Sequence, residues 1–456
     1  MKSKPMPQLP IIVDGDCDSR FDKVKQVFHN NFTQRWESEG AAFAVYLKGE
    51  KVVDLWGGYA DSTSRRKWKN DTMTLLFSST KSICAICFAM LIDRGLVAYE
   101  DLVTKYWPEF GQNGKETITI ETLLSHQGGL AYVDNVIEES DIRDWRRMSK
   151  IFEDQKPNWT PGQEVGYHAV TFGWLVDQLM RRIDPEERSL SQFFKEEITE
   201  PHNIDLVIGA PVELEHRIAR LASEPKFLAA RELIEYPALL KMFWNGLFTS
   251  VNLGNRMFRN MLQNFSWIGS NGTIFNNPEI RSLDMPAVTG MGTARSLAKL
   301  HALVLEGKLL KKTTVEQLFR DPVVLNQTDS VLSINLSLGK GFAYTKNCQG
   351  QWLIGHSGLG GQNVKMDLTN EVAFAYLCNG LKVGYSDLTV TFMRLQSALY
   401  ECLRENNLLK EIPEEKAKES HETVAGRNSS LDISSKNLQE TVPTSLENNT
   451  DLTSDI

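Results

Sequence analysis

The chain has 456 residues, of which 41% are hydrophobic and 24% are charged. This composition is typical of a globular protein with a core of ordinary size. The formal net charge of −8 argues against a nucleic-acid partner, which would favour a basic surface.

The first segment with a clear pattern is "FDKVKQVFHNNFTQRW", which begins near Ser19 and places apolar residues at helical spacing. Two short apolar runs follow, "AAFAVYLKG" and "KVVDLWGG", separated by a Gly-Glu turn at Gly49. Two such runs around a tight turn predict a β-hairpin. The next segment, "LFSSTKSICAI" from Leu76 to Ile86, places hydroxyls and a lysine at the head of an apolar helix that is expected to end near Arg94.

The middle of the chain, from about residue 97 to residue 310, is expected to be mainly helical with long loops. The candidate helices are "TIETLLSH", "AVTFGWLVDQLMRRI", "RELIEYPALLKMFW" and "ARSLAKLHALVLEG". Beyond about Ser337 the pattern indicates strands again: "GKGFAYTK", "QWLIGHSG", "NVKMDLT" and "EVAFAYLCN". A long helix, "LTVTFMRLQSALYECLREN", follows them.

Strands therefore come first and last. We predict an α+β fold in which N- and C-terminal strands form one antiparallel sheet flanked by helices, with the helical lobe (about 97–310) inserted. A cleft between the two parts is the expected place for a site. The domain is assigned to residues 19–410. Residues 411–456 are polar and lack aromatic side chains, which predicts a disordered tail.

The six cysteines are widely scattered, as is typical of a reducing compartment. Cys84 and Cys87 have the spacing of a zinc or redox pair, but no second pair lies nearby, so both are expected to pack in the core. We see no signal peptide and no run of about 18 apolar residues. The chain is therefore expected to be intracellular, in the cytoplasm, with no membrane span. No ligand cluster has metal spacing, so no metal or other cofactor is expected.

Ser78 and Lys81 are three residues apart, a spacing that places two helical side chains on one face. A lysine with a pKa lowered by burial can take the proton of a serine nucleophile. Ser-x-x-Lys alone is a weak signal and occurs four more times, beginning at Ser64, Ser223, Ser296 and Ser337. Only Ser78 begins a buried helix after an apolar lead-in. A simple helix cap is the alternative interpretation.

Two later stretches favour catalysis over a cap. "WTPGQEVGYHAVTFGWL" places Tyr167 just before a helix, and "WLIGHSGLGGQ" places His356 at the end of a strand, followed by glycines. Together, the Ser78–Lys81 stretch, Tyr167-x-Ala169 and His356-x-Gly358 resemble the three motifs of the serine β-lactamase and penicillin-binding protein superfamily. The resemblance covers about residues 21–406. It is strongest to the class C branch and its esterase relatives, which include eukaryotic β-lactamase domain-containing proteins.

The resemblance implies a β-lactamase/transpeptidase-like fold and a role for each motif residue. Ser78 would be the acylated nucleophile and Lys81 would help to deprotonate it. Tyr167, as tyrosinate or through Lys81, would act as base and then protonate the leaving group. The backbone amides of Ser78 and Leu359, beside Gly358, would form the oxyanion hole. His356 would take the place of a lysine and bind substrate.

Two positions depart from the superfamily pattern. Ala169 stands where an asparagine amide would bind the substrate amide and the lysine, and His356 replaces a fixed positive charge for the substrate carboxylate. Both changes favour a small-molecule acyl ester over a β-lactam or a peptide. The alternatives are a scaffold or filament-forming protein that self-associates and has kept its site, and a transacylase. A β-lactamase or D,D-peptidase is the less favoured alternative.

Two further residues are interpreted as structural. His126 in "LLSHQGGL" follows a predicted helix, where a capping or loop hydrogen bond is expected, and Trp159 in "WTPGQ" is expected to support its loop.

Overall fold

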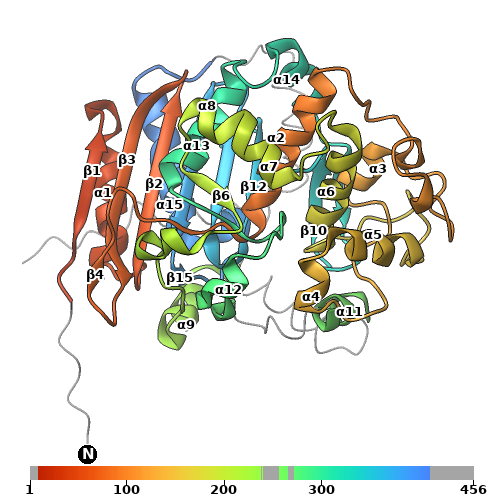
Figure 1. The fold of residues 1–456 in the computed structure, drawn as a ribbon. Helices are drawn as coiled ribbons and strands as arrows, with labels where there is room; N and C mark the ends of the chain where they lie inside the picture. Colours follow the sequence, from red (N-terminus) through yellow and green to blue (C-terminus); the bar gives the residue numbers. More distant parts are fainter. Residues whose placement is uncertain (1–8, 238, 240–255, 265–271, 411–456) are drawn as a thin grey trace, which may run out of the picture. The chain divides into compact units, whose positions relative to one another are not determined.

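A computed structural model describes residues 9–237, 239, 256–264 and 272–410 (Figure 1). The described residues up to Leu408 belong to one compact unit, and the unit that begins at Leu409 is described only at its first two residues. The tail predicted over residues 411–456 lies outside the described residues. So does the C-terminal part of the helix predicted for "RELIEYPALLKMFW".

The predicted N-terminal helix and hairpin are confirmed as α1 (Asp22–Thr33), β2 (Gly40–Leu47) and β3 (Glu50–Asp61). The turn lies at Lys48 and Gly49, whose φ angles of 49° and 83° are both positive, as in the tight turns that suit a hairpin.

One strand, β1 (Val13–Cys17), lies before the predicted start of the domain. It pairs antiparallel with β3, and a Cβ on Gly15 would lie 2.1 Å from the Asp54 carbonyl oxygen. The backbones of β1 and β3 therefore come too close at Gly15 for any residue with a side chain. The short "VDGDC" pattern gave no strand signal because two of its five residues are aspartates and one is glycine.

The strands from the two ends of the chain form one antiparallel sheet, as predicted. Its order is β1-β3-β2-β14-β13-β12-β11-β10-β9, with the short β4 (Arg66–Lys67) beside β3. Strands β2 and β14 join the two halves, with Phe43 opposite Tyr376. The C-terminal strands are β9 (Val324–Thr328), β10 (Asn335–Gly339), β11 (Phe342–Lys346), β12 (Trp352–Ser357), β13 (Asn363–Asp367) and β14 (Val372–Cys378).

Helices cover both faces of the sheet. Strand β14 is buried along its whole length, and alternate residues face opposite sides. On one side Phe374 stacks on Phe392 of α15 (Val390–Glu405), which also packs against α1. On the other side Ala373 and Ala375 join the main core, where α13 (Ala294–Leu305) packs on β2, β13 and β14.

Helix α2 (Thr80–Asp93) is the central element of the helical part. All its residues from Thr80 to Leu91 are buried, and it packs against α6 (Thr171–Ile183), α7 (Leu190–Phe194) and strand β12. Figure 1 shows α3 (Ile120–Leu124), α5 (Trp145–Asp154) and α6 on the side of the sheet away from β1.

Two small sheets accompany these helices. They are β5 (Thr74–Leu75), β8 (Gly290–Gly292) and β6 (Leu206–Ile208), and β15 (Gly380–Leu381) with β7 (Ala222–Ser223). The other helical segments are η1 (Ser19–Phe21), η2 (Phe77–Ser79), η3 (Val103–Lys105), η4 (Pro108–Phe110), α4 (Glu139–Ile142), the π-helix η5 (Lys195–Thr199), α8 (Glu200–His202), η6 (Val212–Arg217), α9 (Lys226–Glu235), α11 (Arg256–Asn264), η8 (Thr273–Asn276), α12 (Pro278–Arg281), α14 (Lys312–Phe319), η9 (Leu359–Gly361) and η10 (Ser386–Leu388).

Cys84 and Cys87 pack in the core, as expected. All six cysteines are free, and Cys84 and Cys87 are fully buried in α2. No helix in the described ranges is both long and apolar enough to cross a membrane.

Candidate active site

The structure brings the three sequence motifs together at the start of α2. Ser78 lies in η2, Lys81 in the first turn of α2, Tyr167 in the loop before α6, and His356 near the end of β12. The Lys81 Nζ atom is 4.9 Å from the centre of the Tyr167 ring, and the Tyr167 and His356 ring centres are 5.9 Å apart. The hydroxyl of Ser79 donates to the main-chain oxygen of His356 at 3.0 Å and ties β12 to the turn of Ser78.

The turn that carries Ser78 differs from the prediction that Ser78 begins the helix. Helix α2 begins at Thr80, and Ser78 precedes it in a 3₁₀ turn. Phe77 enters this turn with a φ of +47°, which is strained for a residue with a bulky side chain. Thr80 holds the turn because its hydroxyl donates to the Phe77 oxygen at 2.6 Å and accepts from the Gly290 amide at 3.1 Å.

Lys81 is fully buried and has three oxygen neighbours. Its Nζ atom lies 2.6 Å from the Ala169 carbonyl oxygen, 3.3 Å from the Ala287 carbonyl oxygen and 3.2 Å from Ser78 Oγ. Burial lowers the pKa of Lys81 to about 7. A neutral amine has two N–H groups and one lone pair. When the two carbonyls accept the N–H groups, the lone pair faces the Ser78 hydroxyl.

The backbone of Ala169 supplies part of what its side chain lacks. The superfamily's asparagine amide would contact the lysine from this position, and here the Ala169 carbonyl makes that contact. The methyl group instead packs in an apolar cluster with Trp159. Recognition of a substrate amide by this side chain is therefore absent, whereas the hold on Lys81 is kept.

The Tyr167 hydroxyl is buried and has no partner of ordinary hydrogen-bonding geometry in the described part of the chain. Burial raises the pKa of Tyr167 well above its usual value, the nearby Tyr385 adds to the rise, and the Ser78 hydroxyl opposes it. A resting tyrosinate, one of the two expected alternatives, is therefore disfavoured. The other alternative, action through Lys81, is the one that the electrostatics favour.

His356 is neutral, as expected for an uncharged replacement of lysine. Burial lowers the pKa of this imidazole to about 3, and Lys81 contributes further. Nδ1 lies 2.7 Å from the Ser357 carbonyl oxygen, so Nδ1 carries the proton and donates it. Nε2 is then an acceptor, and it is buried without a partner among the described residues. The site presents a hydrogen-bond acceptor here instead of a positive charge.

The backbone amides of Ser78 and Leu359, which are the predicted oxyanion donors, lie in the short turns η2 and η9. Gly358 allows β12 to approach the nucleophile turn, because a Cβ there would lie 2.3 Å from the Leu76 carbonyl oxygen. Gly360 has a φ of +77°, a left-handed conformation that favours glycine. The chain can therefore turn sharply after Leu359.

A pair of buried histidines, His126 and His168, supports Tyr167. The His168 amide donates to His126 Nδ1 at 3.1 Å, while His168 Nδ1 donates to the Gly166 oxygen and its Nε2 accepts from the Leu130 amide. The His126 and Tyr167 ring centres are 5.0 Å apart. The expected loop hydrogen bond of His126 is thus confirmed.

Sequence reasoning missed two contributors to this site. His168 adjoins Tyr167 in the second motif, and that adjacency was the one available signal for its role. The Ala287 carbonyl could not be found in that way, because a main-chain oxygen leaves no side-chain pattern. The described residues contain no cluster of histidine, cysteine and carboxylate side chains arranged to hold a metal ion.

These features define a class of proteins: the active-site serine enzymes built on the β-lactamase fold. In this class an antiparallel sheet packs on a buried helix preceded by the serine, and a tyrosine loop and a strand end lie beside it. The chain belongs to the Beta-lactamase family, whose profile matches residues 28–396.

Relatives and solved structures agree with this assignment. The chain is 32% identical to the esterase/beta-lactamase LipL of Mycobacterium tuberculosis (strain ATCC 25618 / H37Rv) over 382 residues, which are 81% of this chain and 83% of LipL. A crystal structure of a family VIII carboxylesterase superposes with a TM-score of 0.74 at 28% identity and covers 86% of this chain and 100% of that one. The structure of a penicillin-binding protein homologue from Caulobacter crescentus superposes with a TM-score of 0.70 at 30% identity. It covers 86% of this chain and 100% of that one.

Proposed function

We propose that this protein is a serine hydrolase that cleaves carboxylic esters through an acyl-enzyme on Ser78. The observation that carries the proposal is the environment of Lys81: a buried amine with its pKa lowered to about 7, two carbonyl acceptors, and Ser78 Oγ 3.2 Å away. These are the conditions under which a lysine activates a serine near neutral pH.

In acylation, Lys81 Nζ takes the Ser78 proton while Oγ bonds to the ester carbonyl carbon. The carbonyl oxygen becomes an oxyanion, which the Ser78 and Leu359 amides bind. The proton then passes from Lys81 to Tyr167, and the phenol gives its own proton to the leaving alkoxide. The carbon–oxygen bond to the alcohol breaks, the alcohol departs, and the acyl group remains on Ser78.

In deacylation, water takes the place of the alcohol. Lys81 and Tyr167 take a proton from the water as its oxygen bonds to the acyl carbon, and the same two amides bind the oxyanion. The bond from the acyl carbon to Oγ then breaks, Ser78 regains its proton, and the carboxylic acid leaves.

An ester suits this site better than a β-lactam or a peptide. Neutral His356 offers no positive charge to a substrate carboxylate, and Ala169 offers no side-chain amide to a substrate amide. The family VIII carboxylesterase is named for ester hydrolysis, and the name of LipL gives both esterase and beta-lactamase.

Labelling with a fluorophosphonate probe and turnover of chromogenic acyl esters test the proposal. The wild-type protein is expected to be labelled and to hydrolyse the esters, and Ser78→Ala is expected to do neither. Ser64→Ala is the matched control, because Ser64 begins another Ser-x-x-Lys in an exposed turn. Equal labelling or equal turnover in wild type and Ser78→Ala would contradict the proposal, as would efficient hydrolysis of a chromogenic cephalosporin with poor ester turnover.

The cytoplasmic location and the capacity for self-association stay predictions. Cell fractionation tests the first. Sedimentation at several protein concentrations tests the second, and a strict monomer would argue against a scaffold or filament role.

A further inference from the structure

The segment from Asp284 to Thr289, which joins α12 to β8, has no regular secondary structure, yet it supplies one of the two carbonyls that hold Lys81. That carbonyl belongs to Ala287. The segment forms a turn of its own, in which the Met285 carbonyl oxygen accepts from the Val288 and Thr289 amides at 2.8 and 2.9 Å. Contacts with neighbouring helices then decide where this turn lies relative to Lys81.

Side chains from three helices hold this segment. Cys84 of α2 lies with its Sγ 2.8 Å from the Pro286 carbonyl oxygen, and Trp174 Nε1 of α6 donates to the Asp284 carbonyl oxygen at 3.2 Å. The Ser191 hydroxyl of α7 donates to Asp284 Oδ2 at 2.5 Å. Gly173 of α6 lets the segment come close, since a Cβ there would lie 2.3 Å from the Ala287 nitrogen.

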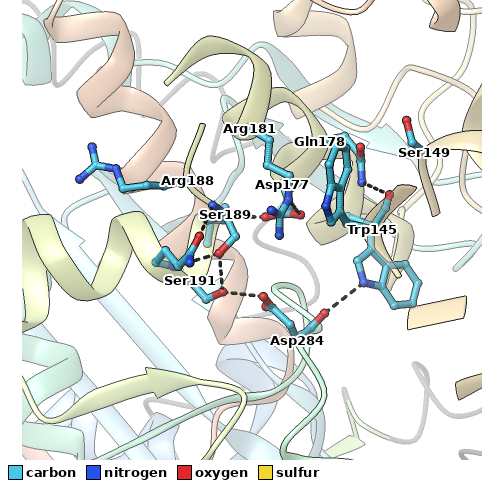
Figure 2. Close-up of polar contacts among 12 residues, drawn as sticks. Trp145, Ser149, Asp177, Gln178, Arg181, Arg188, Ser189, Ser191 and Asp284 are labelled. Atoms are coloured by element: carbon cyan, nitrogen blue, oxygen red, sulfur yellow. Dashed lines mark hydrogen bonds and ion pairs between the residues drawn. The ribbon is translucent and has the colours of Figure 1, made fainter. Parts of the chain in front are cut away.

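The carboxyl group of Asp284 is the side-chain anchor of the segment. Figure 2 shows it below Ser191, whose hydroxyl lies 3.1 Å from that of Ser189. The other carboxyl oxygen, Oδ1, is buried without a partner in the described part of the chain. The charged or titratable groups that face Asp284 are Asp177 and Arg181 of α6 and the Cys84 thiol of α2.

The ionisation of Asp284 follows from this environment. Burial and the charge of Asp177 raise the pKa of Asp284 to about 7, while Ser191 and Arg181 oppose the rise. Asp177 itself is engaged elsewhere, because it accepts from the Leu190 amide and from Arg181 Nε. Near neutral pH a large fraction of Asp284 is therefore protonated, and a neutral side chain of the same shape fits its place.

We infer that Asp284, held by Ser191, is a positioning residue that fixes the Ala287 carbonyl against Lys81 and so directs the lone pair of Lys81 to Ser78. The inference rests on the proposed function. If the segment loosens, one N–H of Lys81 loses its acceptor and the amine turns away from the serine. Small displacements of a reacting group lower rates steeply.

Four variants test the inference. Asp284→Ala and Ser191→Ala break the anchor, whereas Asp284→Asn keeps an oxygen that accepts from Ser191. Ser282→Ala is the matched control, because this exposed hydroxyl donates to Glu279 at the end of α12, two residues before Asp284. The measurements are kcat and KM for a chromogenic ester and the rate of fluorophosphonate labelling as a function of pH.

Asp284→Ala is expected to lower kcat at least about tenfold with KM nearly unchanged, and Ser191→Ala to have the same effect in smaller measure. In both variants the labelling rate is expected to rise with pH at a lower pH than in wild type, because the charged form of Lys81 loses an acceptor and its pKa falls. This rise is called the pH limb. Asp284→Asn and Ser282→Ala are expected to stay within about threefold of wild type, with an unmoved limb. An unmoved limb in Asp284→Ala, or equal losses in Asp284→Ala and Asp284→Asn, would overturn the inference.

A second readout separates this inference from the proposed function. Competitive acetylation of Lys81, followed by mass spectrometry, reports the pKa of its amine without turnover. A lower Lys81 pKa in Asp284→Ala supports the inference even if Ser78→Ala shows that ester hydrolysis occurs elsewhere, and an unchanged Lys81 pKa contradicts it.

Discussion

At Lys81, burial and hydrogen bonding act on the same nitrogen atom in opposite directions. Burial disfavours the ammonium form, while the carbonyls of Ala169 and Ala287 favour it, because they accept stronger hydrogen bonds from an ammonium than from a neutral amine. The result is an amine that is about half charged near pH 7. Such a group can both take and return a proton during one catalytic cycle, because its pKa lies close to the working pH.

The pH dependence of the first chemical step follows from this pKa. Only neutral Lys81 can take the Ser78 proton, so the rate of fluorophosphonate labelling is expected to rise as the pH increases through about 7 and to level off above it. Lys81→Met is expected to lower the plateau by about 10²- to 10⁴-fold. A labelling rate that stays constant from pH 5.5 to 9 would contradict the assignment of Lys81 as the base.

Tyr167 makes a different prediction, because its proposed task is to protonate the leaving group. Tyr167→Phe removes the hydroxyl and leaves the ring in place. The variant is expected to lose about 10²-fold or more in kcat for an alkyl ester. It is expected to lose much less for a p-nitrophenyl ester, because p-nitrophenolate leaves without a proton.

The ratio of the two losses decides this point, and each ester serves as the control for the other. Equal losses on both would mean that Tyr167 acts before the leaving group departs, as a support for Lys81 or for the turn of Ser78.

At the scale of elements, the site depends on how closely β12 approaches the turn before α2. Two features set this distance. The Ser79 hydroxyl donates a hydrogen bond to the His356 carbonyl oxygen, and Gly358 has no side chain that would keep the two segments apart. Both belong to motif segments, which explains why these segments carry small residues beside the reactive ones.

Gly358→Ala tests this approach. The new methyl group would lie 2.3 Å from the Leu76 carbonyl oxygen, so β12 or η2 must shift. Ester turnover is expected to fall by about 10²-fold or more, because the shift moves the Leu359 amide, the proposed oxyanion donor, relative to Ser78. Far-UV circular dichroism and thermal unfolding follow the folded state in parallel. A folded variant with wild-type turnover would contradict the role of this contact.

The elements that the sequence predicted are those with strong periodicity. The hairpin around Gly49, the four strands after Ser337 and helix α15 follow from local patterns. Strand β1 does not, because its pairing with β3 depends on a close backbone approach at Gly15.

In the site, too, contacts between distant parts of the chain could not be predicted from local patterns. Ser78, Lys81 and Tyr167 were found from motifs, whereas Asp284 and Ser191 meet across 93 residues of chain with no shared pattern.

At the scale of the whole molecule, buried titratable groups link stability to pH with opposite signs. Burial raises the pKa of Glu232 and of Asp284 to about 7, so the folded state binds their protons first and gains stability as the pH falls below 7. Burial lowers the pKa of His168 and of His301 to about 4, so the unfolded state binds those protons first. Their contribution is complete above about pH 6.5 and is lost as the pH falls towards 4.

A single histidine isolates one of these contributions. His301 lies on α13 in the core, away from the three motifs, with Nδ1 donating to the Leu297 oxygen at 2.9 Å and Nε2 buried without a partner among the described residues. The variant His301→Phe keeps a ring of similar shape and cannot titrate. The other pH-dependent groups cancel when wild type and variant are compared at each pH.

The difference in unfolding free energy between the two proteins should therefore depend on pH in one direction. Between pH 6.5 and 5.0, the unfolding free energy of wild type is expected to fall by about 1.5 kcal/mol relative to that of His301→Phe. The reason is that His301 binds a proton in the unfolded chain but stays neutral in the folded chain over this range. Urea unfolding at several pH values measures this difference. A difference independent of pH would contradict the prediction, because it would mean that the pKa of His301 is the same in the folded and the unfolded chain. Ester turnover at pH 7.5 should be equal in both proteins, because His301 touches none of the residues assigned to catalysis.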